Sequence, residues 1–465
     1  MPPIPPESLD LATLENVGQI VDITLAALPN DAQPFSVILS GGFARNESGH
    51  YVCNDRLLPF GDYDFDIVVP RPLLDSEERE VHRTLFEELR FQPVTAKSEP
   101  TLVEDPDRFN VLDLRFKTRE EWVERVPDLS LYDLCDSYCV LHGQDVVAEI
   151  PEVALSDISP FSPWRILGNR IVLALNHFTV EFWDRSPTRH EALALRLAVC
   201  RTYLDLAGIL VFLHGSYRTS YRERLDQLRA CPGLWQNWFP DHEAVLNRME
   251  KALSFKKSPS LEAVSGESIR QEWFDLVWDL GRAFPHLTNL VLLSADLPLE
   301  RIRNVLSGTE EAGRTPGAIE NPFKEDWRAL VLRQTRLYPS LFYKDFISAH
   351  LRRKGKRVPY IDFCSKNASR FYGLYEHLVW RGWKWVRGNL RRATLSPPAF
   401  QSAMLPLILF SLTPTRQVNA EAFELFDKMM NPYLPMVFDH LEPLQRWEAS
   451  RRCLVFEMLD YRRKR

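Results

Sequence analysis

The chain has 465 residues, of which 45% are hydrophobic and 26% are charged. This length is too great for one simple core, so we expect roughly two or three domains. The composition is ordinary for a soluble globular protein. The formal net charge of −6 excludes a general electrostatic attraction to nucleic acid, so any polynucleotide contact must come from local basic patches.

Seven cysteines are scattered through the sequence without a repeated spacing. The odd count argues against a disulfide framework, and we expect a reducing, cytoplasmic environment. Cys135 and Cys139 are four residues apart, which would put both on one face of a short helix. Because no second Cys or His pair follows at zinc-ligand spacing, we interpret them as buried thiols rather than as a zinc site.

No segment is expected to enter a membrane. Residues 1–10 lack the basic start and the apolar core of a signal peptide. The longest apolar run, residues 403–412, is interrupted by Pro406 and is about half as long as a spanning helix needs.

The first part of the chain alternates between helical and strand patterns. Residues 9–28 repeat apolar side chains at helical spacing, and residues 35–42 form a short apolar β-type run that ends in two glycines. Residues 63–69 predict a second strand, residues 76–89 a charged amphipathic helix, and residues 109–117 a third strand. This alternation predicts a compact α/β domain.

After Pro160 the pattern is helical, with predicted helices at 164–178, 191–213, 241–255 and 267–283. A segment rich in Gly, Pro and charge then predicts a linker or an exposed loop. The organisation we predict is an N-terminal amphipathic helix at 1–30, the α/β domain at 31–158, a helical domain at 159–306, the linker or loop at 307–322, and a second helical domain at 323–465.

Three aspartates alternate along the predicted strand at 63–69 and just before it. Asp62, Asp64 and Asp66 share one face, because successive side chains of a strand point to opposite sides. Three like charges in a row repel one another unless a cation or a proton offsets them, and Asp is disfavoured within strands. A sequence that breaks local rules in this way is a candidate functional site.

Asp113 projects alone from the opposite face to Leu112 and Leu114. If its strand neighbours the first acidic strand, Asp113 completes a cluster of three carboxylates. Such a cluster suits Mg²⁺, a hard cation that prefers oxygen ligands and shares its coordination sphere with substrate phosphates.

Ser40, Gly41 and Gly42 follow the first predicted strand and precede a predicted helix start. Glycines let the backbone approach a phosphate closely, and N–H groups at a helix start attract it. Arg45 would lie one turn into that helix, where it would contact a triphosphate or instead pair with Glu47 or another acid.

The segments GGFARNE, GDYDFDIVV and LDLRF, in this order, resemble the nucleotidyltransferase superfamily, the fold of polymerase beta, aminoglycoside adenylyltransferases and the minimal nucleotidyltransferases. In that family a Gly-Gly or Gly-Ser turn precedes an Asp-x-Asp strand, and a third Asp lies between apolar residues on a nearby strand. The match covers about residues 35–117. It implies an α/β core, with a mixed sheet and flanking helices, followed here by mostly α-helical C-terminal domains.

The resemblance implies transfer of a nucleoside monophosphate from a metal-bound nucleoside triphosphate to an acceptor, with release of pyrophosphate. Gly41 and Gly42 match the phosphate turn, Asp62 and Asp64 the metal pair, and Asp113 the third carboxylate, which often assists deprotonation of the acceptor. The implied cofactor is Mg²⁺, with Mn²⁺ as an alternative. The implied donor is an NTP, with ATP as the first candidate.

The sequence departs from the family pattern in two places. The segment between Gly42 and Asp62 is longer than usual, so we predict an extra hairpin or loop over the site. Asp66 stands where the family usually has an apolar residue, which leaves open a register in which Asp64 and Asp66 are the metal pair. We favour Asp62 and Asp64, because Gly61 matches the small residue that usually precedes the first family Asp.

The basic runs 352–357 and 462–465 are typical of solvated helix ends, and binding of a nucleic-acid backbone is the sharper alternative. Trp380, Trp383 and Trp385 lie among basic residues, but their helical spacing favours packing over base stacking. Four side chains would either line a cleft or form an amphipathic surface: Arg218, Tyr221, Arg222 and Arg224.

The working hypothesis is therefore a Mg-dependent nucleotidyltransferase whose acceptor, a small molecule, a protein or an RNA, is open. One alternative is a catalytically inactive nucleotide-binding regulator of the toxin–antitoxin or scaffold type. A further alternative is an RNA terminal nucleotidyltransferase that depends on the basic run 352–357.

Overall fold

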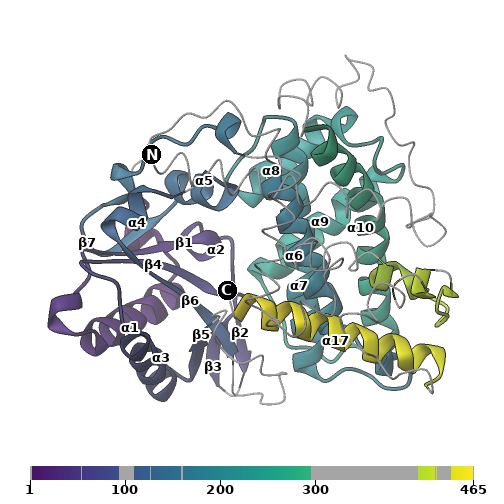
Figure 1. Cartoon of the computed structure of the whole chain (residues 1–465), viewed down its shortest axis with the longest axis horizontal. Helices are drawn as coiled ribbons and strands as arrows, with labels where there is room; N and C mark the ends of the chain where they lie inside the picture. The colour runs from purple at the N-terminus through teal and green to yellow at the C-terminus, as the bar shows by residue number, and fades with distance from the viewer. Residues whose placement is uncertain are drawn as a thin grey trace, which may run out of the picture. The chain divides into compact units, whose positions relative to one another are not determined.

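Figure 1 shows the chain as a computed structural model, which describes residues 3–53, 55–93, 109–125, 127–158, 161–294, 407–420, 422–424, 426 and 441–463. The chain divides into two compact units. Unit 1 contains Met1–Ile158 together with Gly215–Gln227 and Met249–Glu262, and unit 2 contains the remaining residues. Two segments from the helical part of the sequence therefore belong to the same unit as the α/β region.

Unit 1 is built on a five-stranded mixed sheet with the strand order β5-β6-β4-β1-β7. Its strands are β1 (Ser36–Ser40), β4 (Tyr63–Val69), β5 (Phe91–Pro93), β6 (Phe109–Thr118) and β7 (Cys139–Gly143). β4 pairs in parallel with β6 and antiparallel with β1, so it lies in the centre of the sheet. Parallel pairing requires a long crossover between β4 and β6. Part of this connection is α3 (Asp75–Leu89), followed by β5, which is parallel to β6.

Helices cover both faces of the sheet (Figure 1). On one face lies α1 (Leu11–Ala27), whose Asn16 donates a hydrogen bond to the Tyr63 hydroxyl at 3.0 Å. α3 packs beside α1. On the other face lie α4 (Arg119–Val123) and α5 (Leu129–Asp136), which pack Trp122 and Leu134 against Ile38 and Val68. The even-numbered residues of β4 share this second face, so the aspartates point toward the side covered by α4 and α5.

Local sequence signals explain where these helices begin. The Asp10 side chain caps α1 by accepting from the Thr13 N–H at 2.9 Å, and the Thr118 side chain caps α4. Asp128 caps α5 in the same way. The predicted helices at 9–28 and 76–89 are confirmed as α1 and α3.

The segment between the glycine turn and the acidic strand, for which a hairpin or loop was predicted, contains a hairpin. β2 (His50–Cys53) pairs antiparallel with β3 (Arg56–Pro59) in a separate two-stranded sheet. Tyr51 and Leu58 are buried, whereas Val52 is exposed. The remaining short elements of unit 1 are α2 (Gly41–Ala44) and the 3-10 helices Pro6–Ser8, Asn30–Ala32, Val147–Glu149 and Leu155–Asp157.

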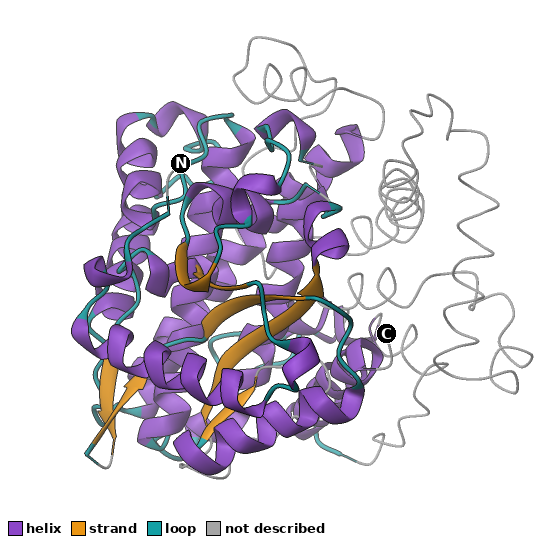
Figure 2. Cartoon of the chain, turned by 90° about the vertical axis from the view of Figure 1, so that its left-hand side faces the viewer, coloured by secondary structure: helices purple, strands orange, loops and turns teal. Residues whose placement is uncertain are grey.

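The described part of unit 2 is helical, and every named strand of the described residues lies in unit 1. Figure 2 distinguishes the helices, in purple, from the strands, in orange. The helices of the second half of the chain are α6 (Phe161–His177), α7 (Arg189–Leu213), α8 (Tyr221–Ala230), α9 (His242–Lys257), α10 (Gly266–Ser294) and α17 (Pro443–Arg463), with 3-10 helices at Val180–Trp183 and Pro232–Leu234. α8 and α9 each have residues in both units. The four helices predicted between 164 and 283 are confirmed as α6, α7, α9 and α10.

The core of unit 2 is rich in aromatic side chains. Phe178 stacks on Trp273 with 3.9 Å between ring centroids, and the Trp273 indole N–H donates to the Ala174 carbonyl. α7 is buried along most of its length, which agrees with its nearly continuous apolar sequence. Among the described residues, no helix combines the length and the apolar character that crossing a bilayer requires.

Candidate metal centre

Three aspartates from two neighbouring strands meet on the face of the sheet that carries α4 and α5. Asp64 of β4 is the direct register partner of Asp113 of β6. Asp62 precedes β4 by one residue and follows Gly61, whose φ of +123° is a conformation that glycine adopts without strain. The sequence pattern alone predicted that Asp113 would join the acidic strand if the two strands were neighbours, and the parallel β4–β6 pairing provides that condition.

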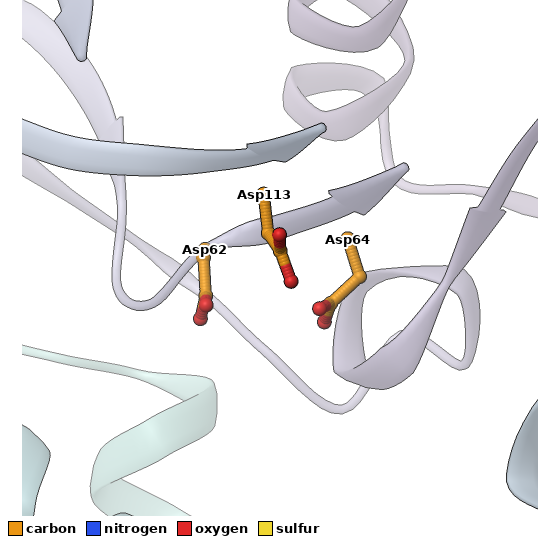
Figure 3. Close-up of side chains that lie close together, drawn as sticks. All are labelled: Asp62, Asp64 and Asp113. Carbon is orange, nitrogen blue, oxygen red and sulfur yellow. The ribbon is translucent and has the colours of Figure 1, made fainter. Parts of the chain in front are cut away.

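The three carboxylates point the same way, with Asp113 between the other two (Figure 3). One oxygen from each of Asp62, Asp64 and Asp113 lies within 4.8 Å of the others. The side chains of Asp64 and Asp113 are 29% and 30% exposed, so the cluster is partly open to solvent. This arrangement offers three oxygen ligands to a single divalent cation, and it is the only such group of acidic, His or Cys side chains found among the described residues.

The carboxylates are hard to ionise together. Burial raises the pKa of Asp64 to about 6, and the negative charges of Asp113 and Asp66 add to this effect, while Arg115 opposes it. Burial also raises the pKa of Asp113, again against the influence of Arg115. Burial and the neighbouring negative charges both oppose ionisation here, and a bound cation would offset them, so the donor set fits a divalent metal ion.

Asp66 has different surroundings from the other two aspartates of its strand. Its side chain is 1% exposed, and its Oδ1 atom lies 3.1 Å from Lys117 Nζ and 3.5 Å from an Arg125 guanidinium nitrogen. Burial opposes ionisation of Asp66, but the charges of Arg115, Lys117 and Arg125 hold its pKa below the ordinary value. Asp66 is therefore an ionised carboxylate already surrounded by protein cations, and it does not belong to the group whose oxygens converge.

The two glycines lie beside this cluster because β1 runs antiparallel to β4 and ends at Ser40, opposite Asp64. Gly41 has a φ of +75°. A Cβ atom at Gly41 would lie 2.4 Å from Asp64 Oδ2, and one at Gly42 would lie 2.3 Å from Ser48 Oγ. The backbone at Gly41 thus approaches the Asp64 carboxylate at a distance that only glycine allows.

The helix predicted after the glycines is shorter than expected. α2 spans only Gly41–Ala44, so Arg45 is its C-terminal capping residue rather than a residue one turn inside it. The Arg45 side chain, which is 7% exposed, pairs with Glu47 at 2.9 Å and lies over the ring of Tyr221 at 5.2 Å. Of the two interactions considered for Arg45, the structure forms the ion pair with Glu47.

Glu47 connects the glycine turn to the start of α8. Its carboxylate accepts hydrogen bonds from the Ser220 hydroxyl at 2.7 Å and from the Arg222 backbone N–H at 3.3 Å. Arg224, one turn further along, is buried and pairs with Asp133 of α5 at 3.1 Å. Within the segment 218–224, the structure therefore gives Arg224 a buried ion pair instead of a place on a solvated amphipathic surface.

Lys256, near the end of α9, is a candidate site residue that was not found from the sequence. It is only 5% exposed. Its Nζ atom would lie 3.6 Å from a Cβ at Gly61, and its Cε atom 3.4 Å from a Cβ at Gly42. The Gly49 N–H donates to the Lys256 carbonyl at 2.9 Å, which fixes the end of α9 against the loop after the glycine turn. This places an ammonium group beside the glycine turn and beside Gly61, the residue before Asp62.

The structure also tests the prediction for Cys135 and Cys139. Cys139 begins β7 whereas Cys135 lies in α5, so the expectation that they share one helix face is wrong, because the helix ends at Asp136. Both are free thiols, and Cys139 is buried. The linker or loop at 307–322, the basic run 352–357 and the tryptophans between 380 and 385 lie outside the described residues.

No family model matches the sequence, and no curated protein matches it. Among solved structures, the chain is similar to spectinomycin adenyltransferase AAD(9) from Enterococcus faecialis, determined with ATP and spectinomycin. The similarity covers 58% of this chain and 98% of that chain, with 13% sequence identity and a TM-score of 0.35. It is a remote likeness.

Proposed function

We propose that this protein is a metal-dependent nucleotidyltransferase, which transfers a nucleoside monophosphate from an NTP to an acceptor and releases pyrophosphate. The observation that carries the proposal is the convergence of Asp62, Asp64 and Asp113 within 4.8 Å, directly beside Gly41. The order and spacing of these residues also resemble the motifs of the nucleotidyltransferase superfamily. We take ATP as the first donor to test and Mg²⁺ or Mn²⁺ as the metal.

Asp62, Asp64 and Asp113 are the residues that would hold the metal. We assign Asp62 rather than Asp66 as the partner of Asp64, because Asp66 is enclosed by Lys117 and Arg125. A bound divalent ion would offset the negative charge of the triphosphate and of the three carboxylates. The remaining work falls to the protein, and it consists mainly of positioning and of electrostatic stabilisation.

We assign the triphosphate to the glycine turn and to Lys256. Gly41 and Gly42 present backbone without side chains next to Asp64, so a phosphate oxygen can approach closely. The Lys256 ammonium, held beside Gly42 and Gly61, supplies a positive charge at the same place. Ser40, at 7% exposure, and Arg45, in its buried pair with Glu47, support this turn from within the protein.

In the reaction, the attacking oxygen or nitrogen of the acceptor forms a bond to the α-phosphorus, and the bond from that phosphorus to the pyrophosphate oxygen breaks. We assign to Asp113 the role of taking the acceptor's proton on a carboxylate oxygen, a role that the family resemblance implies and that its partly exposed side chain supports. Pyrophosphate leaves with the negative charge that the bond cleavage transfers to it.

The test is to incubate the protein with Mg²⁺ and each NTP, across small-molecule, protein and RNA acceptors, and to measure pyrophosphate release. The variant Asp64→Asn should lose release by at least about a hundredfold, because it removes a charged ligand without changing shape. Asp22→Asn, an exposed carboxylate on α1, is the matched control and should behave as wild type. Equal release by the wild type and Asp64→Asn would refute the proposal.

The same experiment addresses the other functions considered. Tight, metal-dependent NTP binding without pyrophosphate release for any acceptor would indicate a nucleotide-binding regulator instead of an enzyme. Release that requires an RNA 3′ end, and that weakens steeply with salt, would indicate a terminal transferase.

A further inference from the structure

Arg115 occupies an unusual position among the carboxylates of the acidic face. Its Nη2 atom lies 3.5 Å from Asp64 Oδ1 and 3.4 Å from Asp66 Oδ2, and its Nε atom lies 3.7 Å from Asp113 Oδ2. Good charge-assisted hydrogen bonds of this type are about 2.7–2.9 Å long, and arginine prefers a bidentate pair with a single carboxylate. Arg115 is therefore shared among three carboxylates without a close pair to any of them.

Two buried atoms show that this arrangement is incomplete. Arg115 Nε and Asp66 Oδ2 have no hydrogen-bond partner, although both are inaccessible to solvent. The two residues are direct register partners on β6 and β4, so their side chains leave the sheet side by side. A buried donor and a buried acceptor without partners are costly, and a small movement of the guanidinium toward Asp66 would satisfy both.

We propose that Arg115 is the resident counter-charge of the metal carboxylates, and that Asp66 receives its guanidinium when a divalent ion enters. This inference rests on the proposed function, because it assumes that Asp64 and Asp113 bind metal. In the metal-free protein, Arg115 offsets part of the charge of Asp64 and Asp113. An incoming cation repels Arg115, whose Nη2 atom is already as close to Asp66 as to Asp64.

Asp66 is suited to this role because its position and its charge are both fixed. It is 1% exposed, and Lys117 and Arg125 both contact its Oδ1 atom. Its Oδ2 atom remains available toward Arg115. Asp66 is thus a positioning residue, which acts on the metal ligands only through Arg115.

Arg115 and Asp66 should be energetically coupled in metal binding. Replacing Arg115 with Met should tighten binding of the metal, because it removes a positive charge a few ångströms from the ion. Replacing Asp66 with Asn should weaken binding, because Arg115 then stays on Asp64 and Asp113. If Asp66 acts only through Arg115, the Asp66→Asn effect must disappear in the Arg115→Met background.

The experiment is a titration of the full-length protein with Mn²⁺ alone, with free Mn²⁺ measured by electron paramagnetic resonance. We expect Arg115→Met to tighten Mn²⁺ binding about tenfold and Asp66→Asn to weaken it about tenfold, consistent with a partly screened charge at this range. The double variant should match Arg115→Met. Arg83→Met, an exposed arginine of α3, is the control and should bind as wild type.

An Asp66→Asn effect of equal size in both backgrounds would overturn the proposal, since it would show direct action of the Asp66 charge on the ion. Unchanged or weaker Mn²⁺ binding in Arg115→Met would also overturn it. If Asp66→Asn does not fold, thermal denaturation of Arg115→Met decides: Mn²⁺ should raise its Tm by more than it raises that of the wild type, and an equal or smaller rise refutes the inference. A wild type that binds no Mn²⁺ would instead refute the proposed function.

Discussion

Gly41 offers a direct test of the candidate metal centre, because a single methyl group added there enters it. The structure places an added Cβ 2.4 Å from Asp64 Oδ2, where real Cβ contacts are essentially never shorter than 3.0 Å. Gly41→Ala must therefore displace either the Asp64 carboxylate or the backbone of the glycine turn. The backbone at this position also has a φ of +75°, which alanine adopts only with strain.

Gly41→Ala should affect activity far more than stability. The left-handed backbone costs an alanine about 1–2 kcal/mol, which is small beside the roughly 5–15 kcal/mol that stabilises a typical domain. Gly41→Ala should therefore fold. Displacing a reacting or metal-binding group by about 1 Å can cost a hundredfold in rate, so nucleotide transfer should fall by about that factor or more.

The control is Gly18→Ala, also in a helix of unit 1. Gly18 has no atom within 4 Å of an added Cβ, so this change should stabilise α1 by about 0.5–1 kcal/mol and leave activity unchanged. Urea denaturation followed by tryptophan fluorescence measures stability, and pyrophosphate release measures activity. If Gly41→Ala transfers nucleotide at the wild-type rate, the placement of Gly41 against Asp64 has no functional meaning and the reasoning is refuted.

Two further predictions concern the charges of the site. Lys256→Ala should raise the KM for the NTP about tenfold or more, because it removes a charge-assisted contact. The exposed neighbour Lys257 is the control, and Lys257→Ala should keep the wild-type KM in steady-state kinetics. If Lys256→Ala also keeps the wild-type KM, the assignment of Lys256 to the triphosphate is contradicted. The stabilising effect of Mn²⁺ should be lost as the pH falls through about 6, because burial raises the pKa of Asp64 to about 6 and its proton competes with the metal. Without metal the sign reverses: the folded state binds the Asp64 proton more tightly than the unfolded state, so wild type should gain stability relative to Asp64→Asn as the pH falls from about 7 to about 4. A Mn²⁺-induced change in Tm that is constant from about pH 5 to about pH 8 would contradict this.

The strand patterns were sufficient to predict the α/β region and the relation between its acidic residues. Alternation along residues 62–66 put the three aspartates on one face, and the apolar neighbours of Asp113 identified the second strand. These signals are local, because the side-chain period of a strand is fixed by its geometry. An extra hairpin or loop was predicted from the length of the segment before Asp62, and this segment contains the hairpin of β2 and β3.

The sequence favoured Asp62 over Asp66 through Gly61, but no local pattern contains the contacts that set Asp66 apart. Asp66 is distinguished by Arg125, which approaches after α4, and by Lys117, which lies further along β6. The alternation of Asp113, Arg115 and Lys117 on one face of β6 was available in the sequence as a sign that the charge of this face changes along the strand. Lys256 gave no comparable signal, because its place depends on how the end of α9 packs against Gly49.

The hydrogen bond from the Gly49 N–H to the Lys256 carbonyl also has a consequence for synthesis of the chain on the ribosome. Ribosomes synthesise the acidic strands and the glycine turn long before α9, yet the proposed triphosphate contact exists only after the segment 249–262 has emerged and joined unit 1. A nascent chain that ends before this segment carries the three carboxylates but lacks the lysine beside them. On the proposed assignment, a chain that has not yet been translated beyond α9 would therefore bind NTP more weakly than the finished protein, by about the tenfold expected for Lys256→Ala.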